Sequence, residues 1–215
     1  GACHGACPAQ AVKRYGYAAT VEEVLAEVLR DMPYYRRTGG GLTVSGGEPA
    51  VQWQFTRELL RRAKEAGVGT LVETAGAVGW EQLWAALEEA DIVYFDLKFA
   101  SSELHKRYTG MDNALILDNL RNTSARKENL VVRIPLIPGI NDAPEELGRM
   151  AELICRLPHV SRIGLLPYHR YGVKKYALLG RDYALEQVAV QAEHSVAQAR
   201  DLLARATGRE VRSGI

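Results

Sequence analysis

Several apolar runs in this sequence are followed directly by polar residues that could bind a charged ligand. The first such segment, Thr43 to Pro49, contains two glycines and then Glu48. Glycine has no Cβ and Pro49 has no N–H, so backbone groups here are open to a ligand rather than paired with a strand. The carboxylate of Glu48 would suit an ammonium group. A lone Gly-Gly segment is, however, more often a tight turn beside a solvated glutamate.

Four further segments place polar or ionisable side chains at or near the end of an apolar run. They are Glu73-Thr74, Asp96 with Lys98, Arg133 shortly before Pro135, and His169. Glu73 suits an ammonium group as Glu48 does, whereas Lys98 and His169 suit a carboxylate. A site that offers both would fit the end group of an amino acid. Lys98 could instead be only a salt-bridge partner of Asp96, but the repetition along the chain favours a binding site.

The elements that must position these side chains alternate along the chain. Strands are predicted over residues 42–45, 68–73, 91–98, 129–135 and 160–166, and helices over 20–32, 55–66, 80–89, 115–126, 144–157 and 185–206. The alternation predicts one α/β domain with a parallel sheet, either open or curled into a partial barrel. Ligands bind at the carboxyl ends of the strands in such folds, so the polar segments should converge on one mouth.

Local signals set several boundaries within this pattern. Thr20 and Glu23 form a capping box at the start of the first helix, and Pro33 ends that helix. The run Gly39 to Gly41 is interpreted as a turn, and Tyr108 to Gly110 as part of a loop. No break in composition divides the chain.

Composition argues against several classes of function. The 215 residues include 27 Lys and Arg against 26 Asp and Glu, a net charge of +1. That balance argues against an extended nucleic-acid surface and a polybasic membrane anchor. No apolar run approaches the roughly 20 residues of a membrane span, and the first residues do not form a signal peptide. Three cysteines cannot form an even set of disulfides, which favours a reduced, cytoplasmic setting.

Two of the cysteines, Cys3 and Cys7, have the spacing C-x3-C-P. This matches the last two cysteines of the ferredoxin pattern C-x2-C-x2-C-x3-C-P, in which thiolates hold an iron–sulfur cluster. Half of a motif is equally compatible with ordinary loop residues. The third cysteine, Cys155, lies among apolar neighbours in a predicted helix and is interpreted as a core residue.

Motifs along nearly the whole chain resemble those of one known family, the glycyl-radical-enzyme activating enzymes of the radical S-adenosylmethionine (SAM) superfamily, relatives of pyruvate formate-lyase activating enzyme. The matching stretches run in order: Tyr34 to Gly41, Thr43 to Pro49, Glu73 to Gly76, Asp96 to Lys98, His105 to Gly110 with Asn113, Arg133 to Gly139 with Asn141, Leu166 to His169, and Lys175-Tyr176 with Leu179-Gly180. Each stretch alone is a weak signal, and together they are specific.

The resemblance implies a partial (β/α)6 TIM-like barrel of the radical SAM type, and a site for SAM at its mouth. Gly46, Gly47 and Glu48 would receive the amino group of SAM. Glu73 would assist them, and Thr74 would belong to the same cofactor-binding set.

The resemblance also implies the other half of the site. Lys98 and His169 would hold the carboxylate of SAM. Asp96 would lie near the radical and the incoming substrate glycine, or would join Thr74 at a monovalent-cation site. Asp96 and Lys98 are therefore the predicted catalytic residues.

One family motif does not occur in this sequence. The family's C-x3-C-x2-C motif, on the loop after its first strand, binds a [4Fe-4S] cluster that chelates SAM and supplies an electron to it. Neither Cys3 with Cys7 nor Cys155 can supply that motif. The chain is therefore interpreted as the C-terminal part of an activating enzyme and lacks the first strand. Residues 1–16 would be the remnant of a ferredoxin-like insert that holds auxiliary [4Fe-4S] clusters, and residues 17–215 the partial barrel.

The resemblance implies that the whole protein activates a glycyl radical enzyme. It would cleave SAM reductively and abstract a hydrogen atom from a backbone glycine of that partner, with flavodoxin or ferredoxin as electron donor. The chain alone is expected neither to assemble the catalytic cluster nor to cleave SAM. The alternative is a degenerate, non-catalytic domain that binds SAM or a protein partner. Which glycyl radical enzyme is the partner stays open.

Overall fold

The computed structural model describes residues 8–9 and 16–214. Cys3 and Cys7 lie outside the described residues, as does nearly all of the predicted iron–sulfur remnant at 1–16. The prediction for that segment therefore stays a prediction. Among the described residues, no helix combines the length and the apolar character that crossing a bilayer requires.

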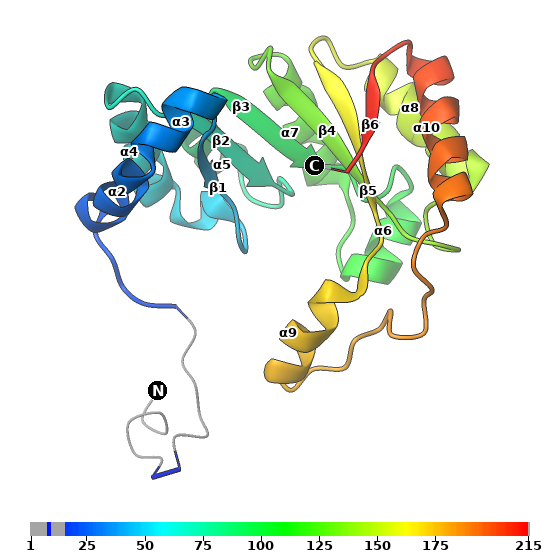
Figure 1. Cartoon of the computed structure of the whole chain (residues 1–215). Coiled ribbons are helices and arrows are strands. Elements are labelled where there is room, and N and C mark those ends of the chain that lie inside the picture. The colour runs from blue at the N-terminus through cyan, green and yellow to red at the C-terminus, as the bar shows by residue number, and fades with distance from the viewer. Residues whose placement is uncertain (1–7, 10–15, 215) are drawn as a thin grey trace.

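Six strands form one parallel sheet, in which each strand pairs with the next along the chain (Figure 1). They are β1 (Gly41–Val44), β2 (Gly69–Thr74), β3 (Ile92–Asp96), β4 (Leu130–Leu136), β5 (Arg162–Pro167) and β6 (Val211–Ser213). An unbroken order of parallel strands is the order of a (β/α) barrel, whereas a doubly wound sheet reverses direction at a switch point. The predicted α/β class and partial barrel are thereby confirmed.

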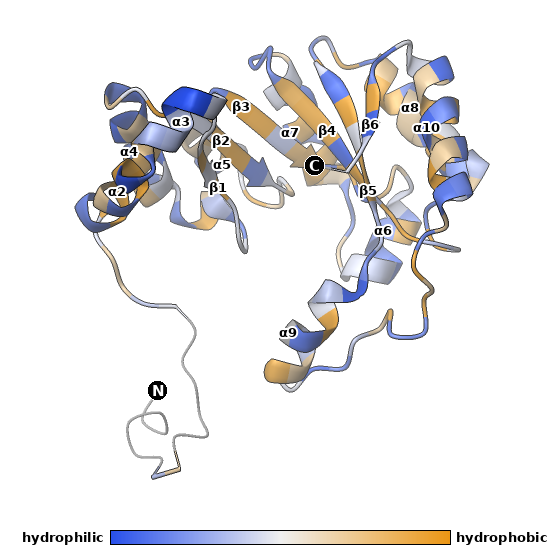
Figure 2. Ribbon diagram, in the orientation of Figure 1, coloured by the Kyte–Doolittle hydropathy of each residue, from blue (hydrophilic) through white to orange (hydrophobic). Residues whose placement is uncertain are grey.

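Helices precede or connect the strands, and most of them cover the outside of the sheet, whereas α9 projects away from it (Figure 1). They are α2 (Val21–Arg30), α3 (Met32–Thr38), α4 (Trp53–Glu65), α5 (Trp80–Leu87), α6 (Ser102–Thr109), α7 (Ala114–Ser124), α8 (Pro144–Cys155), α9 (Val173–Leu178) and α10 (Glu193–Thr207), with 3-10 turns at Pro49–Gln52 and Arg170–Gly172. Figure 2 shows apolar residues concentrated in β3 and β4 and polar residues in the surface helices. This arrangement leaves the strand ends as the place where polar side chains can meet.

The hydrophobic core lies between the sheet and these helices. In β4 every residue except Pro135 is buried, as expected for a central parallel strand that is covered on both faces. Phe95, Leu120 and Met150 are among the largest fully buried side chains. A rigid central strand gives Arg133, in the middle of β4, a fixed position.

The first predicted helix is two helices in the structure. The capping box is confirmed, because the Thr20 hydroxyl accepts from the Glu23 N–H and the Glu23 carboxylate accepts from the Thr20 N–H. Pro33 was predicted to end the first helix, but α2 already ends at Arg30 and Pro33 lies in the first turn of α3, which was not predicted. Proline is tolerated in a first helical turn because its missing N–H has no partner there in any case. Gly39 caps α3 with a φ of 70°.

Three other features also differ from prediction. The segment before Gly110 is helix α6 rather than a loop, capped by the Ser101 hydroxyl. The last long helix begins at Glu193, not near residue 185. Cys155 is exposed rather than in the core. It is the last residue of α8 and lies beside the buried stripe of Met150, Ala151 and Ile154 rather than within it.

Sterics require a glycine at Gly41, the last residue of the triple-glycine run and the first of β1. A Cβ on Gly41 would overlap the backbone carbonyl of its strand partner, Gly69. We expect Gly41→Ala to lower the free energy of unfolding by about 2 kcal/mol, because backbone cannot yield as a side chain can. Urea unfolding measures the change. Gly148→Ala in α8 is the matched control, since a Cβ there meets nothing and alanine favours the helix. Equal stability of the two variants would contradict this account of the close approach.

Candidate functional site

The carboxyl ends of β1 to β4 meet at one edge of the sheet, as the sequence predicted. Register aligns Val44 with Val72, and Asp96 with Arg133. Hydrogen bonds join Ser45, in the loop after β1, to Glu73 of β2, and join Arg133 of β4 to both Glu73 and Asp96 of β3. The convergence of Ser45, Glu73 and Asp96 is therefore a property of the fold.

Arg133 connects the acidic residues of this edge. Its guanidinium donates to both carboxylate oxygens of Glu73, from Nη1 at 2.7 Å and from Nη2 at 3.2 Å. Its Nε donates to Oδ1 of Asp96 at 2.8 Å, and the ring of Tyr94 lies 5.2 Å from its Cζ. The Arg133 side chain is only 8% exposed. A planar fork of this kind holds carboxylates in fixed positions, which a lysine cannot do.

The charge of Arg133 is secured by these partners. Burial lowers the pKa of Arg133, but the hydrogen bonds and charges of Asp96 and Glu73 outweigh it and raise the pKa above its usual value. Arginine already keeps its proton throughout the physiological range. The group of three is therefore a permanent cation between two acidic side chains.

Glu48 joins the loop after β1 to the end of β2. Its carboxylate accepts from the Thr74 hydroxyl at 2.8 Å and from the Ala75 N–H at 3.0 Å. It also accepts from the Ala50 N–H at 3.3 Å. The Ser45 hydroxyl makes a parallel link by donating to Glu73 at 2.8 Å. The structure thus brings together four of the predicted residues and their neighbours: Glu48, Glu73, Thr74 and Asp96.

The two predicted glycines of this loop lie beside open space. Gly46 has a φ of 121°, which only glycine adopts readily, and a Cβ at Gly46 or Gly47 would meet nothing. A cavity of about 670 Å³ borders Ser45, Gly47 and Glu48. Cavities of roughly 300–1,000 Å³ are typical of small-molecule sites. The loop therefore has room for a ligand at its backbone.

The structure does not join the two residues predicted to hold a carboxylate. Lys98 lines a separate cavity of about 290 Å³ with Phe99, Tyr108 and Tyr183. The ring of exposed His169 lies against that of Tyr171, with centres 4.4 Å apart and planes tilted by 36°. His169 lines neither this cavity nor the one beside Gly47. The suggested Lys98–Asp96 salt bridge is also not formed, because Asp96 pairs with Arg133.

Three buried polar side chains fix the loop that carries Lys98. Asn141 donates to the Lys98 carbonyl at 2.9 Å and Asn113 donates to the Phe99 carbonyl at 3.0 Å. The Glu146 carboxylate accepts from the N–H groups of Ala100 and Ser101 at 2.6 and 3.0 Å. We call Asn113, Asn141 and Glu146 the loop clamp.

The sequence predicted Arg133 among the polar side chains at the mouth but assigned it no ligand, and the two asparagines appeared only within the motifs of the family resemblance. Glu146 was missed altogether, since an acidic residue in the first turn of a helix is ordinary. For Arg133 the sequence did contain a signal of a site role, because a charged residue is unusual inside an otherwise apolar strand. The described residues contain no group of three His, Cys, Asp or Glu side chains placed to hold a metal ion. The cation site predicted at Thr74 and Asp96 remains a prediction.

Comparison with known families gives one match that covers most of the chain. Residues 3–154 match the model described as "Radical SAM superfamily". Among curated proteins, the chain is 42% identical over 190 residues to the isethionate sulfite-lyase activating enzyme of Oleidesulfovibrio alaskensis. The aligned region covers 87% of this chain and 61% of that protein. The chain is 37% identical to the pyruvate formate-lyase-activating enzyme of Staphylococcus epidermidis, over 84% of this chain and 74% of the relative.

Solved structures agree with the sequence relatives. A domain of the pyruvate-formate lyase-activating enzyme from Bacteroides vulgatus superposes with a TM-score of 0.68 at 28% identity, over 82% of this chain and 99% of that one. A radical SAM methyltransferase from Sphaerobacter thermophilus has a TM-score of 0.66 at 17% identity, over 91% of this chain and 57% of that one, which supports the fold alone. The chain spans about three fifths of the length of the first curated relatives.

Proposed function

We propose, since this chain belongs to the radical SAM superfamily and within it to the glycyl-radical-enzyme activating enzymes, that the protein activates a glycyl radical enzyme. A [4Fe-4S] cluster, reduced by flavodoxin or ferredoxin, would supply the electron for cleavage of SAM, and the hydrogen atom would come from a backbone glycine of the partner. The 215 residues contain no C-x3-C-x2-C motif, so their own contribution is to hold SAM and the partner glycine.

The observation that carries the proposal is the linked edge of the sheet. Glu48 and Thr74 are hydrogen-bonded to each other, and Glu73 and Asp96 share Arg133. Four predicted site residues are thereby fixed at this edge, and one of them, Glu48, lines the cavity of about 670 Å³. We assign Gly46, Gly47, Glu48 and Glu73 to its ammonium end and Lys98 to its carboxylate. The separate position of His169 gives that residue less support.

A direct test uses the full-length protein, reconstituted anaerobically with iron and sulfide and supplied with SAM and reduced flavodoxin. We expect 5′-deoxyadenosine to accumulate and a glycyl radical signal to appear by electron paramagnetic resonance in a partner enzyme. Isethionate sulfite-lyase and pyruvate formate-lyase are the first partners to try, because relatives of this chain are named for activating them. SAM binding without cleavage would favour the non-catalytic alternative.

The Lys98 assignment predicts a measurable loss of SAM affinity. We expect Lys98→Ala to weaken SAM binding by about 2 kcal/mol, the contribution of a charge-assisted hydrogen bond. Equilibrium binding to the full-length protein measures this change. Lys106→Ala, which removes an exposed lysine of α6, should leave affinity unchanged. If both variants bind SAM as the wild type does, Lys98 does not hold the carboxylate.

A further inference from the structure

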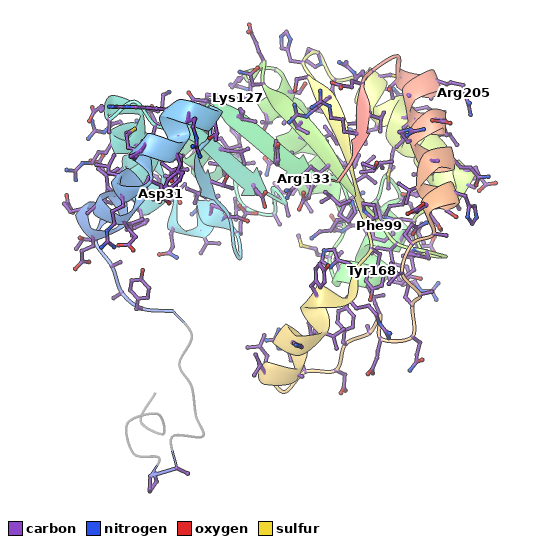
Figure 3. The ribbon with its side chains drawn as sticks, in the orientation of Figure 1. Asp31, Phe99, Lys127, Arg133, Tyr168 and Arg205 are labelled. Atoms are coloured by element: carbon purple, nitrogen blue, oxygen red, sulfur yellow. The ribbon has the colours of Figure 1, made fainter. Side chains whose placement is uncertain are left out.

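A third cavity lies against strands β3 to β6, and three arginines line it. Its volume is about 150 Å³, and its walls include Tyr94, Arg133, Arg162, Gly164 and Arg212. Figure 3 places Arg133 near the middle of the sheet, close to the end of the chain after β6. Of these five residues only Arg133 belongs to the edge described above.

The register of the strands explains how the arginines come together. Arg133 in β4 pairs with Gly164 in β5, and Gly164 pairs with Arg212 in β6. The glycine between them contributes no side chain, and a Cβ there would approach Arg133 Cγ to 3.4 Å. Arg162 lies two residues before Gly164, so its side chain points to the same face of the sheet. Glycine at this position therefore keeps a space open between guanidinium groups.

The carboxylates near this cavity, Glu73, Asp96 and Glu210, equal its three arginines in number but are unevenly placed. Arg133 is paired with Glu73 and Asp96. Arg212 is paired with Glu210, but both side chains are more than half exposed, and exposed pairs bind weakly. Arg162 donates to the neutral hydroxyl of Tyr94 at 3.0 Å, and within the described part of the chain it has no carboxylate partner. No acidic side chain is among the residues that line the cavity.

We propose that this cavity is a binding site for a small oxyanion, a carboxylate or a phosphate group, held between Arg162 and Arg212. Guanidinium groups bind both kinds of oxyanion through paired hydrogen bonds. The volume is about half of the lower limit for drug-sized ligands, so one anionic group fits and a nucleotide does not. Arg212 is exposed, which gives the anion a route from solvent. The site does not depend on the proposed activation reaction.

Titration of the folded chain with inorganic phosphate, and separately with acetate, tests the site and distinguishes the two anions. Calorimetry at constant ionic strength, set with chloride, measures the dissociation constant. We expect saturable binding of at least one anion, weakened about tenfold or more in Arg162→Ala. Arg205→Ala is the matched control, because it removes an exposed arginine of α10 and should bind as the wild type does.

A second variant keeps the charge and removes the space. Gly164→Val fills the cavity while all three arginines remain, so it should also abolish binding; circular dichroism checks that the fold is intact. Anion binding that is equal in the wild type and Arg162→Ala would overturn the proposal. So would the absence of any saturable binding above the chloride background.

Discussion

Replacing Arg133 by methionine is expected to lower the free energy of unfolding by about 3 kcal/mol. Removing one partner of a buried ion pair typically costs about 3–5 kcal/mol, because the opposite charge is left without compensation. Here two carboxylates lose their partner, but Glu73 and Asp96 are 23% and 22% exposed. Solvent reaches them in part, which places the expected loss at the lower end of that range. Urea unfolding followed by circular dichroism measures the change.

Three further variants separate the roles of charge and geometry at Arg133. Arg133→Lys keeps the charge but cannot form the planar fork, so its loss should be intermediate. Adding Glu73→Gln and Asp96→Asn to Arg133→Met should recover part of the stability, since the unpaired charges are then gone. Arg121→Met breaks an exposed pair with Asp118 and should cost less than about 0.5 kcal/mol. If Arg133→Met is no worse than Arg121→Met, the network does not stabilise the edge.

The network around Arg133 shows where sequence reasoning stops. Alternating apolar runs were sufficient to predict the parallel sheet and the edge to which Glu73 and Asp96 belong. Which carboxylates Arg133 would reach depends on register, and the aligned pair of Asp96 and Arg133 is separated by 37 residues in the chain. Periodicity within one strand does not contain that information. The salt bridge suggested between Lys98 and Asp96 was wrong for this reason.

The elements that were missed share a lack of local signal. β6 has three residues, of which Val211 alone is apolar, so no hydrophobic run marks it. Helices α6 and α9 are short, and short helices owe their stability to tertiary packing rather than to propensity. Cys155 was placed in the core because its neighbours in sequence are apolar, although helical geometry directs it away from the buried stripe. To predict that Cys155 is exposed, one must know which face of α8 packs against the sheet.

The sequence predicted a single site for both ends of an amino-acid group, whereas in the structure the residues for the ammonium and those for the carboxylate lie in separate places. The ammonium side is a connected set, because its residues follow short strands that end together. The carboxylate side depends on Lys98 and on His169, and residues 168–192 after β5 contain only short helical turns and irregular backbone. Lys98 follows β3 and His169 follows β5, with β4 between them. Sequence order alone does not specify how far apart the segments after these strands carry the two side chains.

Asn141→Ala is expected to be as damaging as the loss of Arg133, at about 3 kcal/mol of unfolding free energy. Asn141 is 1% exposed. Its amide nitrogen donates to the carbonyls of Lys98 and Pro135, and its Oδ1 accepts from the Ile137 N–H at 2.7 Å. Alanine leaves three backbone groups unpaired, each at a cost of about 1–3 kcal/mol when buried, of which relaxation and water recover a part. The unfolding midpoint in urea measures the loss.

The chemistry of Asn141 also predicts that aspartate is no substitute. Aspartate can still accept from Ile137, but it places a second oxygen against the carbonyls of Lys98 and Pro135, where a donor is required. Asn141→Asp should therefore be at least as unstable as Asn141→Ala, although it is nearly the same size. Asn122→Ala, at an exposed position of α7, should be neutral. A stable Asn141→Asp variant would mean that the asparagine acts by filling space, and that hydrogen bonds to the Lys98 loop contribute little to holding the site together.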